Sequence, residues 1–172
     1  GGYRIIGENA LDRVNSISGA GDFNGDGFDD VVIGAFGNDV GGSYSGAAYV
    51  VFGSNTLPTS VNLDTVALGV GGFKIAGETA YDYAGFSVSS AGDVNGDGLG
   101  DLIVSATGND VGGDRAGAAY VVFGTQTPPT SVNLGAVATG VGGFKIIGEN
   151  TLDRAGNSVS SAGDFNGDGF DD

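Results

Sequence analysis

GDFNGDGFDD, residues 21–30, recurs as GDVNGDGLGD at 92–101 and again as GDFNGDGFDD at 163–172, so that successive copies lie 71 residues apart. In each copy, oxygen-bearing side chains stand at the first, third, fifth and ninth positions counted from the first aspartate. Hard cations prefer such ligands, and Ca²⁺ takes roughly six to eight oxygens. Glycine at the sixth position permits the sharp turn that brings these side chains together. The pattern predicts a repeat array with one Ca²⁺ per loop.

The predicted ligands are the side chains at those four positions and the backbone carbonyl at the seventh. They are Asp22, Asn24, Asp26, Phe28 and Asp30 in the first loop, Asp93, Asn95, Asp97, Leu99 and Asp101 in the second, and Asp164, Asn166, Asp168, Phe170 and Asp172 in the third. Carboxylates held this close repel one another unless a cation lies between them, which argues against a metal-free acidic turn. An EF-hand loop needs glutamate at position 12, where this chain has Ile33 or Val104. Asp29 and Asp171 are not expected to be ligands, because their counterpart is Gly100.

Composition limits the class of protein. The chain has 172 residues with 36 glycines, 40% hydrophobic residues, 10 Phe and 6 Tyr, which is typical of a folded repeat protein rather than a linker. Its net charge of −15, with only 6 Lys and Arg, argues against binding to nucleic acid or to an anionic membrane. The chain has no Cys, which excludes disulfides, a cysteine zinc site and thiol catalysis. No apolar run approaches the roughly 20 residues that span a bilayer, so we expect no membrane insertion.

Short runs of Val, Ile, Phe and Tyr bounded by Gly, Asn and Asp predict an all-β fold. Val31–Ile33 and Leu102–Val104 are continuously apolar, so these strands are expected to be covered on both faces. Gly46–Ala48 and Gly117–Ala119 have small side chains that suit close packing against a neighbouring sheet. A short helical turn is possible in the spacer around Val61–Leu68. Four strands in each repeat of about 70 residues favour propeller blades or an open stack of small sheets.

The repeat resembles the FG-GAP repeat of integrin alpha-chain propellers and of bacterial surface proteins. The resemblance rests on Val88–Asp93, the acidic loop, Leu102–Ala106 and Ala119–Gly124, and it covers essentially the whole chain. It implies four-stranded blades, usually seven to a ring, with calcium between the innermost strand and the next. The implied innermost strands are 15–21, 86–92 and 157–163, and the second strands are 30–35 and 101–106. The third strands are 47–52 and 118–123, and the outer strands are 3–7, 73–77 and 144–148.

This resemblance divides the chain into two complete blades with a partial blade at each end. Residues 1–14 would supply an outer strand, 15–85 and 86–156 the complete blades, and 157–172 an inner strand with its calcium loop. Two blades cannot close a ring, and the outer strand 3–7 and the inner strand 157–163 would leave open edges, which invite association. We therefore expect the chain to continue into further repeats or to self-associate, and of the two we favour the longer chain.

Other recurring polar residues are interpreted as structural. Glu8, Glu78 and Glu149 recur, as do Asp12, Asp82 and Asp153; a paired-carboxylate active site is disfavoured because the pattern appears in every repeat, and a weak second metal contact is the other alternative. Asn38-Asp39 and Asn109-Asp110 are predicted to form turns. Arg13 and Arg154 are expected to pair with nearby acids. Tyr44, Tyr81 and Tyr83 lie in loops, where they would pack on the protein or stack on a sugar. Without His, Cys or a serine in a triad pattern, no enzyme is predicted.

The sequence thus indicates a calcium-stabilised propeller segment of a secreted or cell-surface protein that serves as a structural or adhesive scaffold for a protein or carbohydrate ligand. Two other functions remain open, a carbohydrate-binding propeller and a subunit of an extracellular filament, as does an enzyme domain elsewhere in a parent chain. Aromatic side chains converging on one face would favour the carbohydrate-binding propeller.

Overall fold

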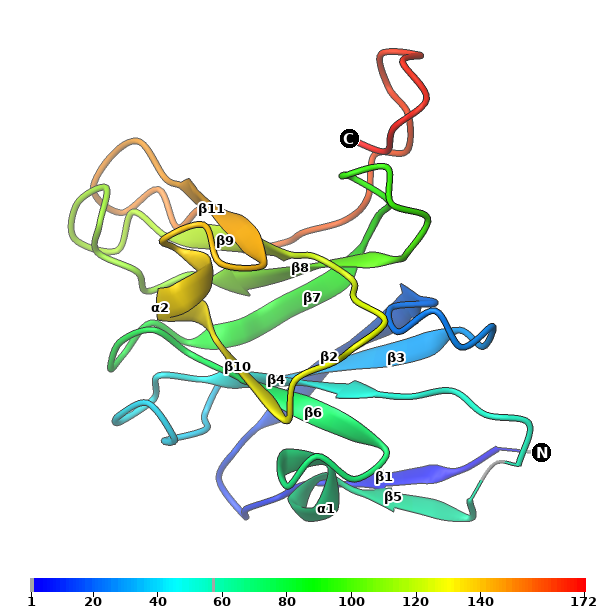
Figure 1. Cartoon of the computed structure of the whole chain (residues 1–172). Coiled ribbons are helices and arrows are strands. Elements are labelled where there is room, and N and C mark those ends of the chain that lie inside the picture. The colour runs from blue at the N-terminus through cyan, green and yellow to red at the C-terminus, as the bar shows by residue number, and fades with distance from the viewer. Residues whose placement is uncertain (1, 57) are drawn as a thin grey trace.

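Three separate sheets hold nearly all the regular structure in residues 2–56 and 58–172, the part of the chain that this computed structural model describes. The strands are β1 (Arg4–Ile6), β2 (Val14–Gly21), β3 (Asp30–Ala35), β4 (Ala47–Val51), β5 (Ser60–Asn62), β6 (Gly72–Ala76), β7 (Ala84–Gly92), β8 (Asp101–Ala106), β9 (Ala118–Val122), β10 (Ser131–Asn133) and β11 (Gly143–Ile147). The helices are α1 (Leu63–Ala67) and α2 (Leu134–Val137). A five-stranded sheet has the order β10-β6-β4-β3-β2, a four-stranded sheet has the order β11-β9-β8-β7, and β1 pairs with β5 (Figure 1).

The two larger sheets contain the same four-stranded antiparallel unit. In the first, β2, β3, β4 and β6 follow one another across the sheet, and in the second β7, β8, β9 and β11 do so. These eight strands lie within two residues of the ranges predicted for them. The all-β class and the order of the strands are confirmed, and neither sheet closes on itself. The division of the chain into complete and partial blades stays a prediction.

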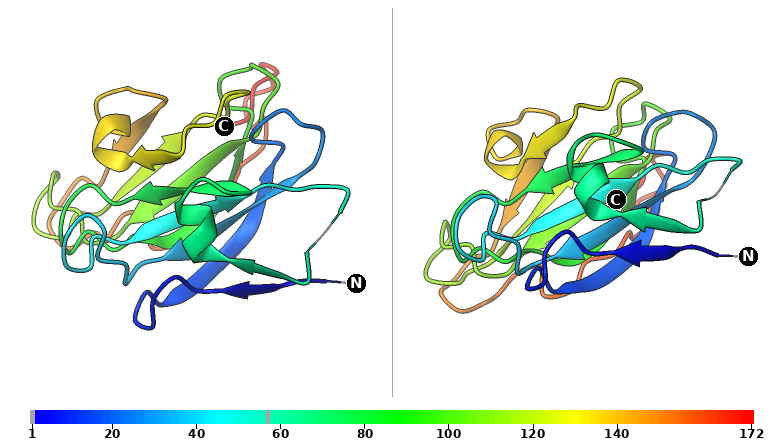
Figure 2. Two further views of the ribbon diagram at one scale, coloured as in Figure 1. Left: turned by 60° about the horizontal axis from the view of Figure 1, so that its bottom comes forward. Right: turned by 90° about the horizontal axis from the view of Figure 1, so that it is seen from below.

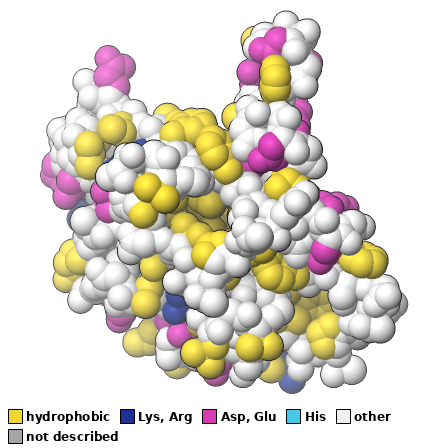
Figure 3. Space-filling model, viewed as in Figure 1, with side chains coloured by type: hydrophobic (Ala, Val, Ile, Leu, Met, Phe, Trp, Pro, Cys, Tyr) yellow, Lys and Arg dark blue, Asp and Glu magenta, His cyan; other side chains and the backbone are white. Residues whose placement is uncertain are grey.

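The inner strand predicted at 157–163 is not formed, and that prediction is wrong for this structure. The segment keeps isolated contacts, among them a hydrogen bond of 3.2 Å from the Val159 amide to the Ser87 hydroxyl. In the other two repeats this strand pairs with the strand after the acidic loop, β3 or β8. Figure 3 shows the third loop projecting from one corner with acidic side chains on its surface.

The spacer between the third and fourth strands of each repeat joins neighbouring repeats, which the sequence pattern did not predict. β5 pairs in parallel with β1, and β10 pairs in parallel with β6, so each spacer strand extends the outer strand of the preceding repeat. The outer strand at 3–7 therefore has a partner where an open edge was expected. The helical turn expected near 61–68 is confirmed as α1, and α2 is its counterpart. The Asn62 and Asn133 side chains cap these helices by accepting from the amides two residues ahead.

The main core lies between the two larger sheets, which pack face to face (Figures 1 and 2). Val32, Val50 and Phe73 from the five-stranded sheet meet Leu102 and Val104 from the four-stranded sheet. A second cluster on the opposite face of the five-stranded sheet includes Ile33, Val51, Leu63 and Val66. β3 is thus covered on both faces, as its apolar run predicted, whereas Ile103 of β8 is only half-buried.

Glycine permits the close approach of the two units. A Cβ placed on Gly34 would overlap the carbonyl oxygen of Gly85, and one on Gly46 would overlap the backbone of Ala84. Gly46 and Ala84 also form a parallel bridge between the two repeats. Ala48 of β4 and Ala118 of β9 belong to the core between the two sheets, in agreement with the small side chains expected to pack there.

Candidate functional site

The first two acidic loops connect the same pair of strands in successive repeats, and all three loops lie at one end of the sheets (Figure 1). The first joins β2 to β3 and the second joins β7 to β8. Two glycines in each loop have positive φ: 72° and 89° at Gly25 and Gly27, and 74° and 85° at Gly96 and Gly98. Only glycine reaches this region at little cost, so these residues set the curl of the loop.

The polar side chains of each loop fold back over its own backbone. The two Asp22 carboxylate oxygens accept hydrogen bonds from the amides of Asp26 (3.0 Å) and Gly27 (2.9 Å). The Asn24 side-chain oxygen also accepts from the Asp26 amide (2.9 Å), so the Asp22 and Asn24 oxygens lie close together. The second and third loops repeat this arrangement at Asp93 and Asn95 and at Asp164 and Asn166.

The ninth-position aspartate is held differently, because it lies at the start of the next strand. Asp30 and Asp101 are buried, and each accepts from a loop amide and from a glycine amide beyond the third strand, at Gly53 and Gly124 respectively (both 2.8 Å). The pKa of Asp30 is raised to about 6, mainly by burial; the Gly53 and Phe23 amides oppose this rise, and the nearby Asp26 and Asp22 charges add to it. Burial likewise raises the pKa of Asp101, with Asp97 and Asp93 adding to it. This is negative charge that a cation would offset.

The donor set fits a hard cation, because every predicted ligand supplies oxygen. The convergence is incomplete: among residues 2–56 and 58–172, no three carboxylates lie close enough together to hold a metal ion. In the first loop the carboxylates point to other partners. Both Asp30 oxygens accept hydrogen bonds from backbone amides. Asp26 accepts from the Phe28 amide and from the Asn24 side chain. Oxygens that accept one amide keep a second lone pair. The fifteen predicted ligands therefore stay a prediction.

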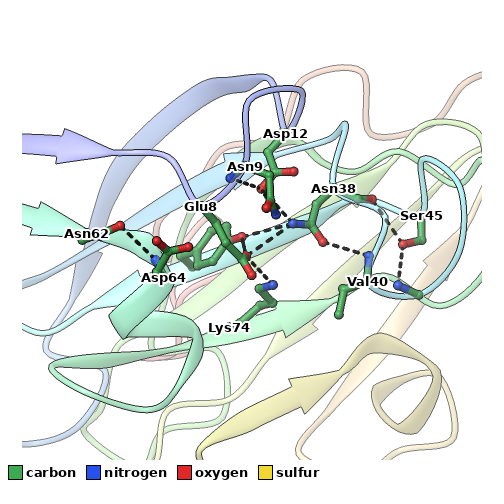
Figure 4. Close-up of polar contacts among 11 residues, drawn as sticks. Glu8, Asn9, Asp12, Asn38, Val40, Ser45, Asn62, Asp64 and Lys74 are labelled. Atoms are coloured by element: carbon green, nitrogen blue, oxygen red, sulfur yellow. Dashed lines mark hydrogen bonds and ion pairs between the residues drawn. The ribbon is translucent and has the colours of Figure 1, made fainter.

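A second repeated cluster joins successive repeats, and the sequence pattern recognised only part of it. Glu8, in the connection between β1 and β2, forms an ion pair with Lys74 of β6 and accepts a hydrogen bond from the Tyr49 hydroxyl of β4 (Figure 4). Tyr49 and Lys74 are direct cross-strand partners, and the Lys74 ammonium lies 5.3 Å from the Tyr49 ring centroid. Burial tends to raise the pKa of Glu8, but the contacts with Lys74 and Tyr49 hold it below its usual value.

Asparagine and aspartate side chains in the loops form hydrogen bonds with this cluster. The Asn38 amide donates to Asp12 (2.9 Å) and to the Tyr49 hydroxyl (3.2 Å), while its oxygen accepts from the Val40 amide (3.0 Å). Asp12 also accepts from the Asn9 amide at 3.2 Å. The predicted turn role of Asn38 is confirmed, and the recurring acids Glu8 and Asp12 have a structural role.

The second repeat has the same cluster. Glu78, in the connection between β6 and β7, accepts hydrogen bonds from Lys145 of β11 (2.7 Å) and from the Tyr120 hydroxyl of β9, and Asn109 bridges Tyr120 to Asp82. Sequence reasoning missed the tyrosine and the lysine. Their signal was present, since Tyr49 and Tyr120, like Lys74 and Lys145, are 71 residues apart in the same apolar strands.

The β1–β2, β3–β4 and β6–β7 connections lie at the end of the sheets opposite the acidic loops (Figure 1), and aromatic rings contact one another and Arg13 there. Tyr44 stacks on Tyr81 with ring centroids 6.4 Å apart and an interplanar angle of 18°, and it also contacts Tyr83. The Arg13 guanidinium lies 5.6 Å from the Tyr44 ring centroid and 5.7 Å from that of Phe36. The expected pairing of Arg13 and Arg154 with acids is therefore wrong: within the described residues both ion pairs belong to lysines, because Arg13 stacks on aromatic rings.

A cavity of about 580 Å³ lies between β9 and the β9–β10 connection. Its walls are mostly apolar and include Phe23, Val122 and Val141, with Asp97 of the second acidic loop at its edge. Figure 3 shows apolar side chains gathered in a hollow on this face.

In the part of the chain that the structure describes, no helix has the length and apolar character needed to cross a membrane.

Comparison with known proteins agrees with this architecture. The profile of the FG-GAP repeat matches residues 14–51 and 84–122, which run from the inner strand to the third strand of each unit. The chain is also similar to integrin alpha pat-2 of Caenorhabditis elegans, with 33% identity over 177 residues. That alignment covers 94% of this chain, and the chain spans 12% of the length of the relative.

Proposed function

Since the chain is a member of the FG-GAP repeat family, we propose that it is a calcium-stabilised β-propeller segment of a secreted or cell-surface protein, with a recognition or adhesive role rather than a catalytic one. Repeated four-stranded units that pack face to face support the propeller part of this proposal. The similarity to an integrin alpha chain supports the extracellular scaffold. The ligand would be a protein or a carbohydrate.

The observation that carries the calcium proposal is the identical fold of the acidic loop in successive repeats. In each of the first two loops, the first aspartate and the asparagine both accept a hydrogen bond from the amide of the fifth-position aspartate. The ninth-position aspartate is buried at the first residue of the next strand. The carboxylates of each loop are grouped in a single turn, so a charge of opposite sign would stabilise them. A bound Ca²⁺ would supply that charge to Asp22, Asn24, Asp26 and Asp30 and to the Phe28 carbonyl, after Asp26 and Asp30 exchange amide contacts for the ion.

Calcium titration with magnesium as control tests this proposal. Calcium should bind with a Kd of roughly 10⁻⁴–10⁻³ M, the range of extracellular modules, whereas Mg²⁺ requires a near-ideal octahedron that a glycine-rich loop does not provide. At ten times Kd each site adds about 1.4 kcal/mol to the free energy of unfolding. Chelation should therefore lower Tm. Equal heats for the two metals, or a Tm unchanged by chelator, would refute calcium stabilisation.

Carbohydrate binding is the second candidate, and one observation favours it over a filament role. Phe86 of β7 and the loop residues Phe36, Tyr44, Tyr81 and Tyr83 gather at one end of the molecule, with neighbouring ring centroids 5.5–6.4 Å apart. Grouped rings of this kind offer flat apolar surface beside polar edges, which suits the face of a sugar ring.

A further inference from the structure

The few basic side chains of this acidic protein are divided between two roles. The chain has six Lys and Arg against 21 Asp and Glu. Both lysines are nearly buried and paired with glutamates. Arg13, Arg115 and Arg154 instead lie in the connections at the aromatic end, and within the described residues none of the three forms an ion pair. Such a concentration of exposed guanidinium groups is unexpected in a chain with a net charge of −15 and plentiful acids.

Two of these arginines share a cavity with aromatic rings. Arg115 and Arg154 line a cavity of about 260 Å³, and the Arg154 amide donates to the Arg115 carbonyl (3.1 Å), which holds their backbones together. Phe36, Tyr83 and Phe86 also line this cavity, with the Phe36 ring centroid 5.5 Å from that of Phe86 and 6.4 Å from that of Tyr83. The cavity is smaller than the roughly 300–1,000 Å³ of drug-sized pockets, so it suits a group the size of a single ring.

Backbone conformation supports a role for these side chains. All described non-glycine residues with positive φ lie in the connections at this end: Arg13, Tyr44, Tyr81, Tyr83, Arg115, Leu152 and Arg154. Large side chains cost roughly 1–2 kcal/mol in this conformation. Glycine, which occupies the 21 other positive-φ positions among the described residues, would relieve that cost. The presence of tyrosine and arginine here indicates that their side chains contribute something that glycine would not.

We infer that this cavity binds the carboxylate-bearing ring of an acidic saccharide, a uronic acid. Arg115 and Arg154 would hold the carboxylate, since the guanidinium fork matches its geometry. Phe36, Tyr83 and Phe86 would pack against the apolar C–H face of the sugar ring. The inference rests on the proposed recognition role and not on calcium, because none of these residues belongs to an acidic loop.

A uronic acid fits the cavity better than other anions do. An acidic peptide side chain supplies the carboxylate but no flat face for the three rings. A densely sulfated polymer would be repelled by the −15 net charge of the protein. A neutral hexose would satisfy the rings and leave both guanidiniums unused.

NMR titration of the full chain with four sugars tests the inference. Methyl glucuronoside and methyl galacturonoside are compared with methyl glucoside and methyl galactoside, which differ from them only in the carboxylate. At least one uronoside should bind about tenfold tighter or more than its neutral counterpart, as expected for hydrogen bonds to a charged group. Ring resonances of Tyr83 should shift during the titration while those of Tyr3, outside the cavity, stay unchanged.

The double variant Arg115→Asn, Arg154→Asn should abolish the preference for the uronoside. Asparagine tolerates positive φ, so the variant should keep its fold. Arg4→Asn is the control, because Arg4 is an exposed arginine of β1 that does not line the cavity. It should retain the preference. If the double variant fails to fold, the Tyr83 shifts in the unaltered protein show whether a uronoside occupies the cavity.

Four outcomes would overturn the inference: no binding of either uronoside at about 10 mM, equal binding of neutral and acidic sugars, equal binding of acetyl-glutamate amide, or equal loss in the control variant. Intact calcium heats alongside a failed sugar titration would refute only this inference. Absent calcium heats alongside a retained uronoside preference would refute only the calcium proposal.

Discussion

Glu78 and Lys145 are 67 residues apart in sequence, yet the Lys145 ammonium donates a hydrogen bond of 2.7 Å to the Glu78 carboxylate. Glu78 lies where the chain leaves the five-stranded sheet, and Lys145 lies in the outer strand of the four-stranded sheet. The Lys145 side chain is only 6% exposed. The pair therefore joins the connection of one repeat to the outer half of the next, as Glu8 and Lys74 do one repeat earlier.

Glu78→Gln should destabilise the protein by about 3 kcal/mol, because it leaves a buried ammonium without its counter-charge. Urea denaturation measures the change in the free energy of unfolding. Glu149→Gln is the matched control, since Glu149 is the equivalent residue of the third repeat and is exposed. It should change stability by no more than about 0.5 kcal/mol. Equal effects of the two substitutions would show that the pair does not join the repeats.

Acid should weaken the same contacts. Burial would raise the pKa of Glu78, but Lys145 and Tyr120 hold it below its usual value of 4.5, and Lys74 and Tyr49 do the same for Glu8. A carboxyl group with a lowered folded-state pKa stabilises the fold above its unfolded pKa, and this contribution is lost as pH falls through the folded value. The contribution of these two glutamates to the free energy of unfolding should therefore fall below about pH 4.5. Glu78→Gln should flatten that fall, which stability measurements between pH 3 and pH 6 would reveal; an unaltered slope would contradict the assignment.

Asp26→Asn should reduce the calcium-dependent increase in Tm, because it removes one carboxylate from the first loop while keeping its shape. Asp29→Asn makes the same change of charge at an exposed neighbour that is not a predicted ligand. Thermal melts with and without calcium give the difference for each variant. At ten times Kd, loss of one site corresponds to about 1.4 kcal/mol. Comparable losses in the two variants would mean that calcium responds to overall charge and not to the predicted ligands.

Gly34→Ala should destabilise the protein by about 3 kcal/mol, near the upper end of overpacking effects, because the new Cβ would meet the backbone oxygen of Gly85 in the next repeat. Gly19→Ala, on the adjacent strand β2, is the control, since a Cβ there meets no atom within 4 Å. That substitution should be neutral or slightly stabilising, because alanine has less conformational freedom in the unfolded chain. Chemical denaturation of both variants tests whether the close approach of the sheets limits this position.

The repeat, the eight strands of the two four-stranded units and the place of the acidic loops could all be predicted from the amino-acid sequence. These features depend on local rules: apolar runs bounded by glycine and aspartate predict strands, and a 71-residue period relates one unit to the next. The sequence also predicted the turn role of Asn38, because that side chain accepts from an amide only two residues away.

The contacts between residues far apart in the sequence depend on the tertiary fold and could not be predicted from local patterns. Tyr49 and Lys74 become partners through the register of β4 and β6, and Glu8 reaches them from a different repeat. The spacer strands β5 and β10 find their partners in the preceding repeat, so their three-residue runs carry no signal of their own. Residues 157–163 have the inner-strand sequence yet form no strand, because a strand exists only with a partner to accept its hydrogen bonds. The cavity between Arg115 and Phe36 likewise arises where loops of two repeats come together, and no local pattern specifies such a meeting.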